Sequence, residues 1–78
     1  MRVIVAGEYA PDVSKANVTH WFVQEGAVCE AGSDLVEFAD SKNVFVVKAP
    51  ARMRVVRIVA QKGALIDAAS VLCEGDDA

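Results

Sequence analysis

The sequence is poor in the residues that build catalytic and metal sites. Among 78 residues it has one histidine, His20, and two cysteines, Cys29 and Cys73. A zinc site needs four ligands, or three and a water, so these residues are too few and too widely spread. No acid pair or nucleophile with a base stands out either. We therefore expect a protein that is not an enzyme in its own right.

Long apolar runs and basic clusters are also missing. The stretch MRVIVAGEYAPDV lacks the apolar core of a signal peptide, and no run approaches membrane-spanning length. The net charge is −3, and lysines and arginines stand singly, without the basic stripe that a nucleic acid requires. We expect one domain over residues 1–78, in the cytoplasm or, in a eukaryote, the mitochondrial matrix. Neither nucleic acid nor a membrane is an expected partner.

The chain contains an internal duplication. Residues 18–37 (VTHWFVQEGAVCEAGSDLVE) align without a gap on residues 55–74 (VVRIVAQKGALIDAASVLCE), 37 positions later. Eight of the twenty aligned positions are identical: Val18/Val55, Gln24/Gln61, Gly26/Gly63, Ala27/Ala64, Ala31/Ala68, Ser33/Ser70, Leu35/Leu72 and Glu37/Glu74. Two copies are fewer than a solenoid needs. We therefore expect two halves that face each other across a pseudo-twofold axis and share one core.

The duplication bears on the cysteines. Their number alone allows a disulfide. However, Cys29 aligns with Ile66, and Cys73 aligns with Val36, so each thiol occupies a place where the other half has an aliphatic side chain. We expect two reduced, partly buried thiols that behave as small hydrophobic side chains.

Short segments rich in valine and isoleucine, separated by Gly, Asp, Ser or Pro, predict strands. They cover residues 3–7, 18–24, 34–38, 44–50, 54–60 and 70–74. This spacing predicts an all-β sandwich or barrel. The segment 11–18 (PDVSKANV) has helix-capping residues but soon meets valine and threonine, so it is predicted to be a loop.

Two further positions follow from the strand pattern. Gly26 and Gly63 end equivalent strands, where we expect turns with positive φ. In THWFVQ the alternation puts Trp21 on one face and His20 on the other. Because His20 aligns with Arg57, we expect it to be a solvated surface residue.

One lysine, Lys42, lies between two strand-like runs, in the segment ADSKN. Asp40 suits the first position of a type I turn, because its carboxylate bonds to backbone amides ahead of it; Ser41 and Asn43 tolerate the other positions. We expect a tight hairpin with Lys42 near its apex, at one end of the molecule and close to the twofold axis. A lysine there is ordinarily just solvated surface, and its ammonium group is no nucleophile on its own at neutral pH.

The spacing around Lys42 resembles the biotinyl/lipoyl attachment domain family. In that family W-x-V precedes a glycine, and a second glycine, L-x-E and the modified lysine follow at fixed steps. An A-P pair, an isoleucine and a glycine come after the lysine. This chain matches without a gap at Trp21, Val23, Gly26, Gly32, Leu35, Glu37, Lys42, Ala49, Pro50, Ile58 and Gly63.

The resemblance implies a fold and a function. The fold is a flattened barrel-sandwich of two four-stranded antiparallel sheets, with the lysine turn at one end and both termini at the other. The function is that of a swinging-arm carrier: lipoate, amide-linked to Lys42, shuttles an acyl or one-carbon intermediate between active sites of a multienzyme complex. The implied partners are a lipoate ligase or transferase and the enzymes of a complex such as a 2-oxo acid dehydrogenase.

The turn departs from the family in ways that leave alternatives open. Biotin carriers have methionines on both sides of the lysine, whereas this chain has Ser41 and Asn43, so biotin is less favoured than lipoate. Lipoyl domains usually have an acid directly before the lysine, whereas Asp40 stands one place further back. An unmodified lipoyl-like module for binding or scaffolding is the alternative function.

Two other positions and one loop complete the sequence-based expectations. Met53 and Ala69 replace family glycines, which predicts turns of a different shape if those glycines have positive φ. The segment 7–17 (GEYAPDVSKAN) is the candidate for reading the partner enzyme, since it is predicted to be a surface loop near the lysine.

Overall fold

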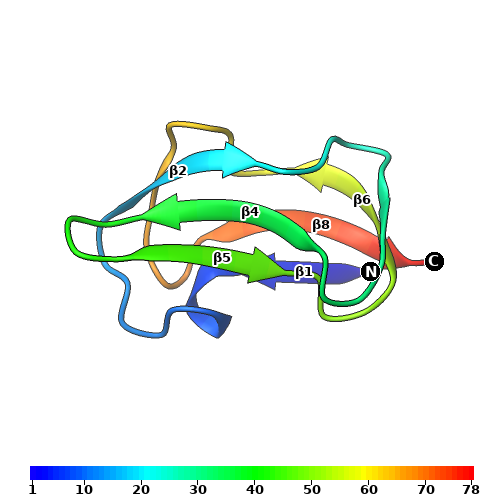
Figure 1. Ribbon diagram of the computed structural model, residues 1–78, viewed down its shortest axis with the longest axis horizontal. Helices are drawn as coiled ribbons and strands as arrows, with labels where there is room; N and C mark the ends of the chain where they lie inside the picture. Colours follow the sequence, from blue (N-terminus) through cyan, green and yellow to red (C-terminus); the bar gives the residue numbers. More distant parts are fainter.

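The computed structural model describes residues 1–78 as two stacked four-stranded antiparallel sheets, 34 × 20 × 18 Å overall (Figure 1). One sheet has the order β1-β8-β6-β3, formed by Arg2–Val5, Val71–Asp77, Met53–Ile58 and Val28–Cys29. The other has the order β5-β4-β2-β7, formed by Val44–Lys48, Asp34–Ala39, Ala16–Trp21 and Leu65–Ile66. One turn of 3-10 helix, η1 (Ala6–Glu8), follows β1. The predicted flattened all-β sandwich is confirmed, and no helix in it could span a bilayer.

All six predicted strand segments form strands, with differences at their ends. β2 begins at Ala16, inside the segment predicted to be a loop, and stops at Trp21, three residues before the predicted end. The early start is explained by burial: Ala16 and Val18 lie in the core on either side of the exposed Asn17, which pairs with both β4 and β7. The two-residue strands β3 and β7 were not predicted, because so short a run carries no periodic signal.

The pseudo-twofold relation is confirmed by the backbone. Strands β2, β3 and β4 begin 37 positions before β6, β7 and β8 respectively. The halves also exchange reciprocal hydrogen bonds, from the Gly26 N–H to the Val55 carbonyl (2.6 Å) and from the Gly63 N–H to the Val18 carbonyl (2.7 Å). Both glycines have φ of 91°, as predicted for these turns. The duplicated sequence therefore forms duplicated structure.

One expectation about the symmetry is wrong. The turn with Lys42 lies at one end of the long axis, as expected, but not close to the pseudo-twofold axis. Asp40 in this turn corresponds to Asp77 in the repeat. Asp77 is the last residue of β8, which ends beside the start of β1 at the opposite end of the molecule (Figure 1). The axis therefore passes between the two ends.

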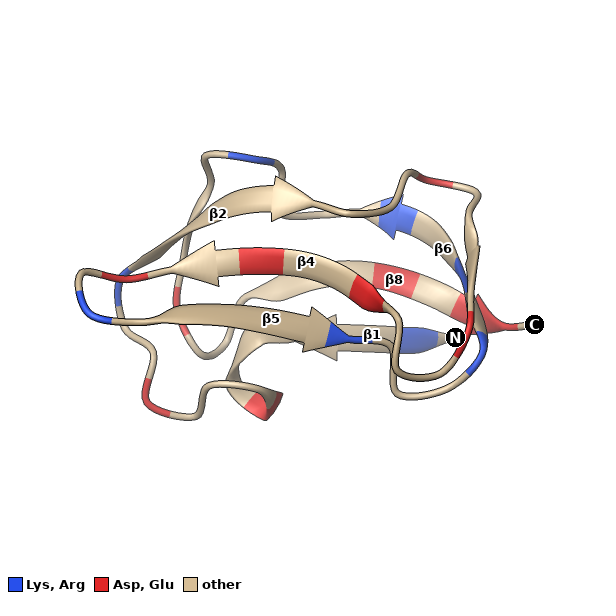
Figure 2. Ribbon diagram, in the orientation of Figure 1, with Lys and Arg blue, Asp and Glu red and all other residues tan.

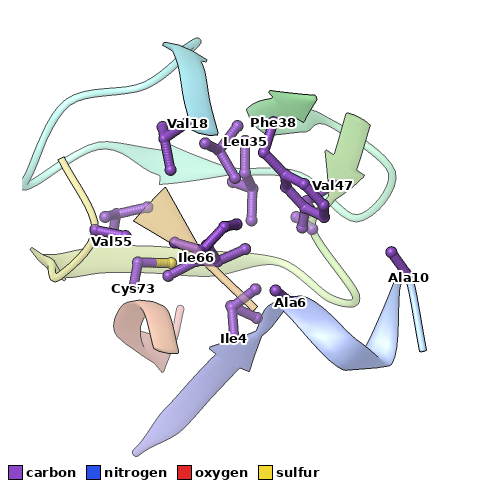
Figure 3. Packing of buried hydrophobic residues seen from close by; sticks show 14 of the residues in the cluster. Ile4, Ala6, Ala10, Val18, Leu35, Phe38, Val47, Val55, Ile66 and Cys73 are labelled. Atoms are coloured by element: carbon purple, nitrogen blue, oxygen red, sulfur yellow. The ribbon is translucent and has the colours of Figure 1, made fainter. Parts of the chain in front are cut away.

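The core is a single cluster of 18 buried hydrophobic residues shared by both sheets. Figure 3 shows Val18, Leu35 and Val47 of one sheet facing Val55 and Cys73 of the other. Burial of each such aliphatic side chain contributes roughly 1.5–3 kcal/mol. No polar or charged side chain is buried, so the core between the sheets consists of apolar groups.

The two cysteines belong to this core. Cys29 and Cys73 are free and buried, as the duplication predicted. Burial, with a smaller contribution from nearby Cys29, raises the pKa of the Cys73 thiol to about 11. A thiol with so high a pKa stays protonated and unreactive at neutral pH.

At two corresponding positions the halves differ in side-chain size in opposite directions. Met53 in β6 corresponds to Ala16 in β2, and Gly75 in β8 corresponds to Phe38 in β4. A Cβ atom on Gly75 would lie 2.6 Å from the Met53 Cε and closer still to the Arg54 carbonyl oxygen. At these positions the first half thus has a small residue in β2 and a large one in β4, whereas the second half has a large residue in β6 and glycine in β8. Met53 has no positive φ and simply fills the space that Gly75 leaves.

The turn before β4 and its repeat mate before β8 differ in conformation. Gly32 has φ of 85°, and its N–H bonds to the Ala49 carbonyl (2.8 Å). Ala69, at the equivalent position, has no positive φ, and its N–H bonds instead to the Asp67 Oδ1 (2.9 Å). The sequence predicted a changed turn at Ala69, and the side chain of Asp67 provides it.

Candidate functional site

Lys42 lies in the turn between β4 and β5, at the end of the molecule opposite to both termini (Figure 1). The two strands are paired up to the last residues before the turn, Ala39 and Val44. Residues 40–43 project beyond this pair, and Ser41, Lys42 and Asn43 are all exposed. The sheet therefore presents the turn to solvent.

The carboxylate of Asp40 organises the turn. Its Oδ1 accepts hydrogen bonds from the N–H groups of Lys42 (2.8 Å) and Asn43 (2.7 Å). The N–H of Asp40 in turn donates to the Asn43 carbonyl (3.0 Å). The bond from the Lys42 N–H, followed by that from Asn43, holds the pKa of Asp40 below its ordinary value. This is the arrangement expected from the sequence for an aspartate at the first position of the turn.

The Lys42 side chain itself is free. Its ammonium group takes part in no hydrogen bond and no ion pair. By contrast, Lys48 at the other end of β5 is bound to Asp34 (2.6 Å). The remaining ion pairs also involve other residues: Arg2 with Asp77, Arg52 with Glu30, and Arg57 with Glu74. Figure 2 shows the basic position of the β4–β5 turn far from the charged positions around the termini.

A groove of about 310 Å³ adjoins the turn. One wall is the loop after η1, and the other is formed by the turn and the start of β5; the lining residues are Tyr9, Ala10, Pro11, Asp12, Val13, Asp40, Asn43 and Phe45. The predicted partner-reading segment 7–17 is thus adjacent to the lysine turn. Its role in recognition stays a prediction.

Tyr9 fixes the loop wall of this groove. Its hydroxyl donates a hydrogen bond to the Lys48 carbonyl of β5 (3.2 Å), and burial, with a smaller contribution from Glu8, raises the pKa of the phenol. Sequence analysis singled out the segment but not Tyr9 or Phe45. No local signal distinguishes them, because the groove forms only when the loop meets β5, 39 residues away in the chain from Tyr9 to Lys48.

His20 lies away from the turn, where it is exposed and packs edge-to-face on Phe22 with ring centroids 4.7 Å apart. This is the surface position that its alignment with Arg57 predicted. The buried thiols described above do not reach the surface at the turn. The lysine turn and the groove beside it are therefore the chemically distinctive surface of this chain.

The sequence model of the family described as "Biotin-requiring enzyme" matches residues 2–74. The chain belongs to this biotinyl/lipoyl attachment family. A search of curated proteins gives no match. Domains of this family carry covalently attached lipoate or biotin and work with partner enzymes of multienzyme complexes. They are carriers and not catalysts.

The residues present fit such a group at the lysine turn. Amide attachment needs a primary amine that is accessible and not engaged in an ion pair, and the Lys42 amine at the turn meets both requirements. Lys15 and Lys62 are also exposed and unpaired, but Lys42 is the one of these lysines that lies in a hairpin turn between two paired strands. The neighbouring groove is partly apolar, with Tyr9, Pro11 and Phe45 in its walls. The core has no buried polar side chain and so offers no second attachment point.

Proposed function

We propose that this protein is a swinging-arm carrier domain with lipoate amide-linked to Lys42. The observation that carries the proposal is the free ammonium group of Lys42 at the projecting turn of a family member. The implied partners are a lipoate ligase or transferase, which attaches the group, and the enzymes of a complex such as a 2-oxo acid dehydrogenase. These work in the cytoplasm or the mitochondrial matrix.

The work of the chain in this function is mechanical. The β4–β5 hairpin holds the backbone of Lys42 in one place, while the flexible side chain leaves the attached group free to move. When bound, lipoate supplies the disulfide ring that takes up and releases the acyl or one-carbon unit. Tethering keeps that ring near the partner's active site at a high effective concentration, of mM order for short flexible links.

Lipoate is favoured over biotin by the residues that flank the lysine. Ser41 and Asn43 are exposed and polar, whereas biotin carriers have a methionine on each side. The backbone N–H of Asn43 donates to the Asp40 Oδ1, so Asn43 takes part in the hydrogen bonding of the turn through its main chain.

An unmodified binding or scaffolding module is the second candidate. It is favoured by one observation, which is that Ser41 and not an acid directly precedes Lys42. A ligase that requires the acid at that place would leave the lysine free.

The intact mass of the protein, produced in cells with lipoate and biotin ligases, tests these functions. We expect the increment of one lipoyl group. The larger increment of biotin would replace lipoate by biotin, and an unchanged mass would favour the scaffolding module. Lys42→Ala should abolish the increment, while Lys48→Ala, a matched change at the other end of β5, should retain it. An increment that survives in Lys42→Ala would contradict the site.

A further inference from the structure

The turn that presents Lys42 lacks the usual means of closing a tight hairpin. Two-residue hairpin turns are mostly of types I′ and II′, which need positive φ and therefore favour glycine. Residues 40–43 include no glycine, and none of them has positive φ. The one main-chain hydrogen bond across the turn is that from the Asp40 N–H to the Asn43 carbonyl. The conformation of the residues between them must be held in another way.

Asp40 supplies the missing hydrogen bonds. The N–H groups of Lys42 and Asn43 lie outside the strands and bond to no main-chain carbonyl, so the Asp40 Oδ1 is their acceptor. Bonds to an ionised carboxylate are roughly twice as strong as those between neutral groups. A single side chain therefore supplies the two hydrogen bonds of the turn that the main chain does not.

This carboxylate bonds to the backbone of the turn and forms no ion pair with the amine, although Asp40 and Lys42 are close in sequence. The arrangement thus fixes the backbone of Lys42 and leaves its side chain exposed.

We propose that Asp40 is a positioning residue for the modification of Lys42. It acts through the N–H groups of Lys42 and Asn43 and holds the turn in the shape that the ligase binds. The reaction joins Nζ of Lys42 to the acyl carbon of an activated carboxyl that the ligase provides; the amine loses a proton and the activating group departs. This inference rests on the proposed function and adds a residue to it.

The chain provides its own control for the test. Asp67 caps the turn before β8 in a related manner: its Oδ1 accepts the backbone N–H of Ala69 (2.9 Å) and, in place of a second backbone N–H, the hydroxyl of Ser70 (3.3 Å). That turn, residues 67–70, contains no lysine. Asp67→Ala therefore removes a related cap and the same charge without touching the attachment site.

The experiment measures initial rates of lipoate attachment to the unmodified protein by a lipoate ligase with lipoate and ATP. Intact mass follows product, and protein concentration is varied to separate kcat from KM. For Asp40→Ala we expect kcat/KM to fall by about 10- to 100-fold, since misplacing a reacting group by about 1 Å has effects of that size. Asp40→Asn should recover most of the rate, because the amide oxygen can still accept both bonds. Asp67→Ala should react like the wild type.

The outcomes distinguish a failure of the positioning role of Asp40 from a failure of the proposed carrier function. If the wild type accepts neither lipoate nor biotin, the proposed function fails. Amide hydrogen exchange at Lys42 and Asn43 then still tests the bonds, and equal exchange in the wild type and Asp40→Ala overturns them. If the wild type is lipoylated, an unchanged rate in Asp40→Ala overturns the inference. So does an equal loss of rate in Asp67→Ala, or an Asp40→Asn variant as slow as Asp40→Ala.

Discussion

The two halves of the molecule contain corresponding strand pairs, β4–β5 and β8–β1, that differ in how they are connected. β4 and β5 are joined by the turn that Asp40 caps, and Lys42 stands at its tip. Their repeat mates, β8 and β1, are the last and first strands, and no turn joins them. Asp77, the mate of Asp40, instead bonds to Arg2 with its carboxylate (2.8 Å). The same position thus holds an acid in both halves, with different partners.

This difference separates what the fold needs from what the lysine end adds. Both strand pairs are complete, although one of them has no connecting turn. The exposed pair of Arg2 and Asp77 contributes less than about 1 kcal/mol by the usual measure of surface ion pairs. The sandwich therefore does not depend on the closed turn, and the turn is free to serve the chemistry of Lys42.

The largest expected change in stability is at Met53, which corresponds to Ala16 in the other half. Met53→Ala opens a cavity in the core and should lower the free energy of unfolding by about 3 kcal/mol. Gly75→Ala alone should cost about 2 kcal/mol, because its methyl group meets Met53 and the Arg54 carbonyl. Urea unfolding of both single variants and the double variant measures these energies.

The double variant tests whether the sizes of these two side chains are coupled. Removal of the Met53 side chain takes away one of the two obstacles to a Cβ at Gly75. We therefore expect the double variant to lose less stability than the sum of the single losses. Strictly additive losses would mean that the two positions are not coupled.

A smaller effect distinguishes the turn before β4 from the turn before β8. Gly32→Ala should cost about 1 kcal/mol, because an alanine at φ of 85° is strained although its Cβ meets no atom. Ala69→Gly should bring no gain, since Ala69 has no positive φ. Thermal unfolding of the two variants checks this contrast. A stabilised Ala69→Gly variant would contradict the conformational difference between the turns.

The smallest effect is the response of the lysine turn to acid. The pKa of Asp40 is lowered from 3.8, so the bonds of its carboxylate are intact above about pH 4 and are lost as the pH falls through the lowered pKa. The carboxyl carbon of Asp40 and the amide signals of Lys42 and Asn43 should shift together in an NMR titration. Titration of Asp40 at or above 3.8, or independent shifts of the amides, would argue against the cap.

Most of the fold could be predicted because the sequence repeats itself. Identities such as Gly26 with Gly63 gave the register of the two halves, and each cysteine was placed in the core by its aliphatic counterpart. The position of the lysine turn relative to the pseudo-twofold axis was predicted wrongly, because the link between two repeats was taken to lie near their axis. Chain order does not give that information; pairing of β1 with β8 does.

The candidate site was predictable in part, for a local reason. An aspartate that caps the amides following it needs only its neighbours in sequence, so the turn at Lys42 was foreseen. The groove was not, because it needs Tyr9 from one loop and Phe45 from β5 to meet. The compensation between Met53 and Gly75 was equally hidden, since a methionine in place of a family glycine gives no hint of where its volume is accommodated.

Both termini lie at the end of the domain opposite to Lys42, so rotation about that end would move the lysine turn the furthest. With a long axis of 34 Å, a pivot at the ends of β1 and β8 would let the lysine sweep an arc of about that radius. The Lys42 side chain extends this radius further. A small rotation about that pivot would therefore move the lysine much further than it moves the ends of β1 and β8.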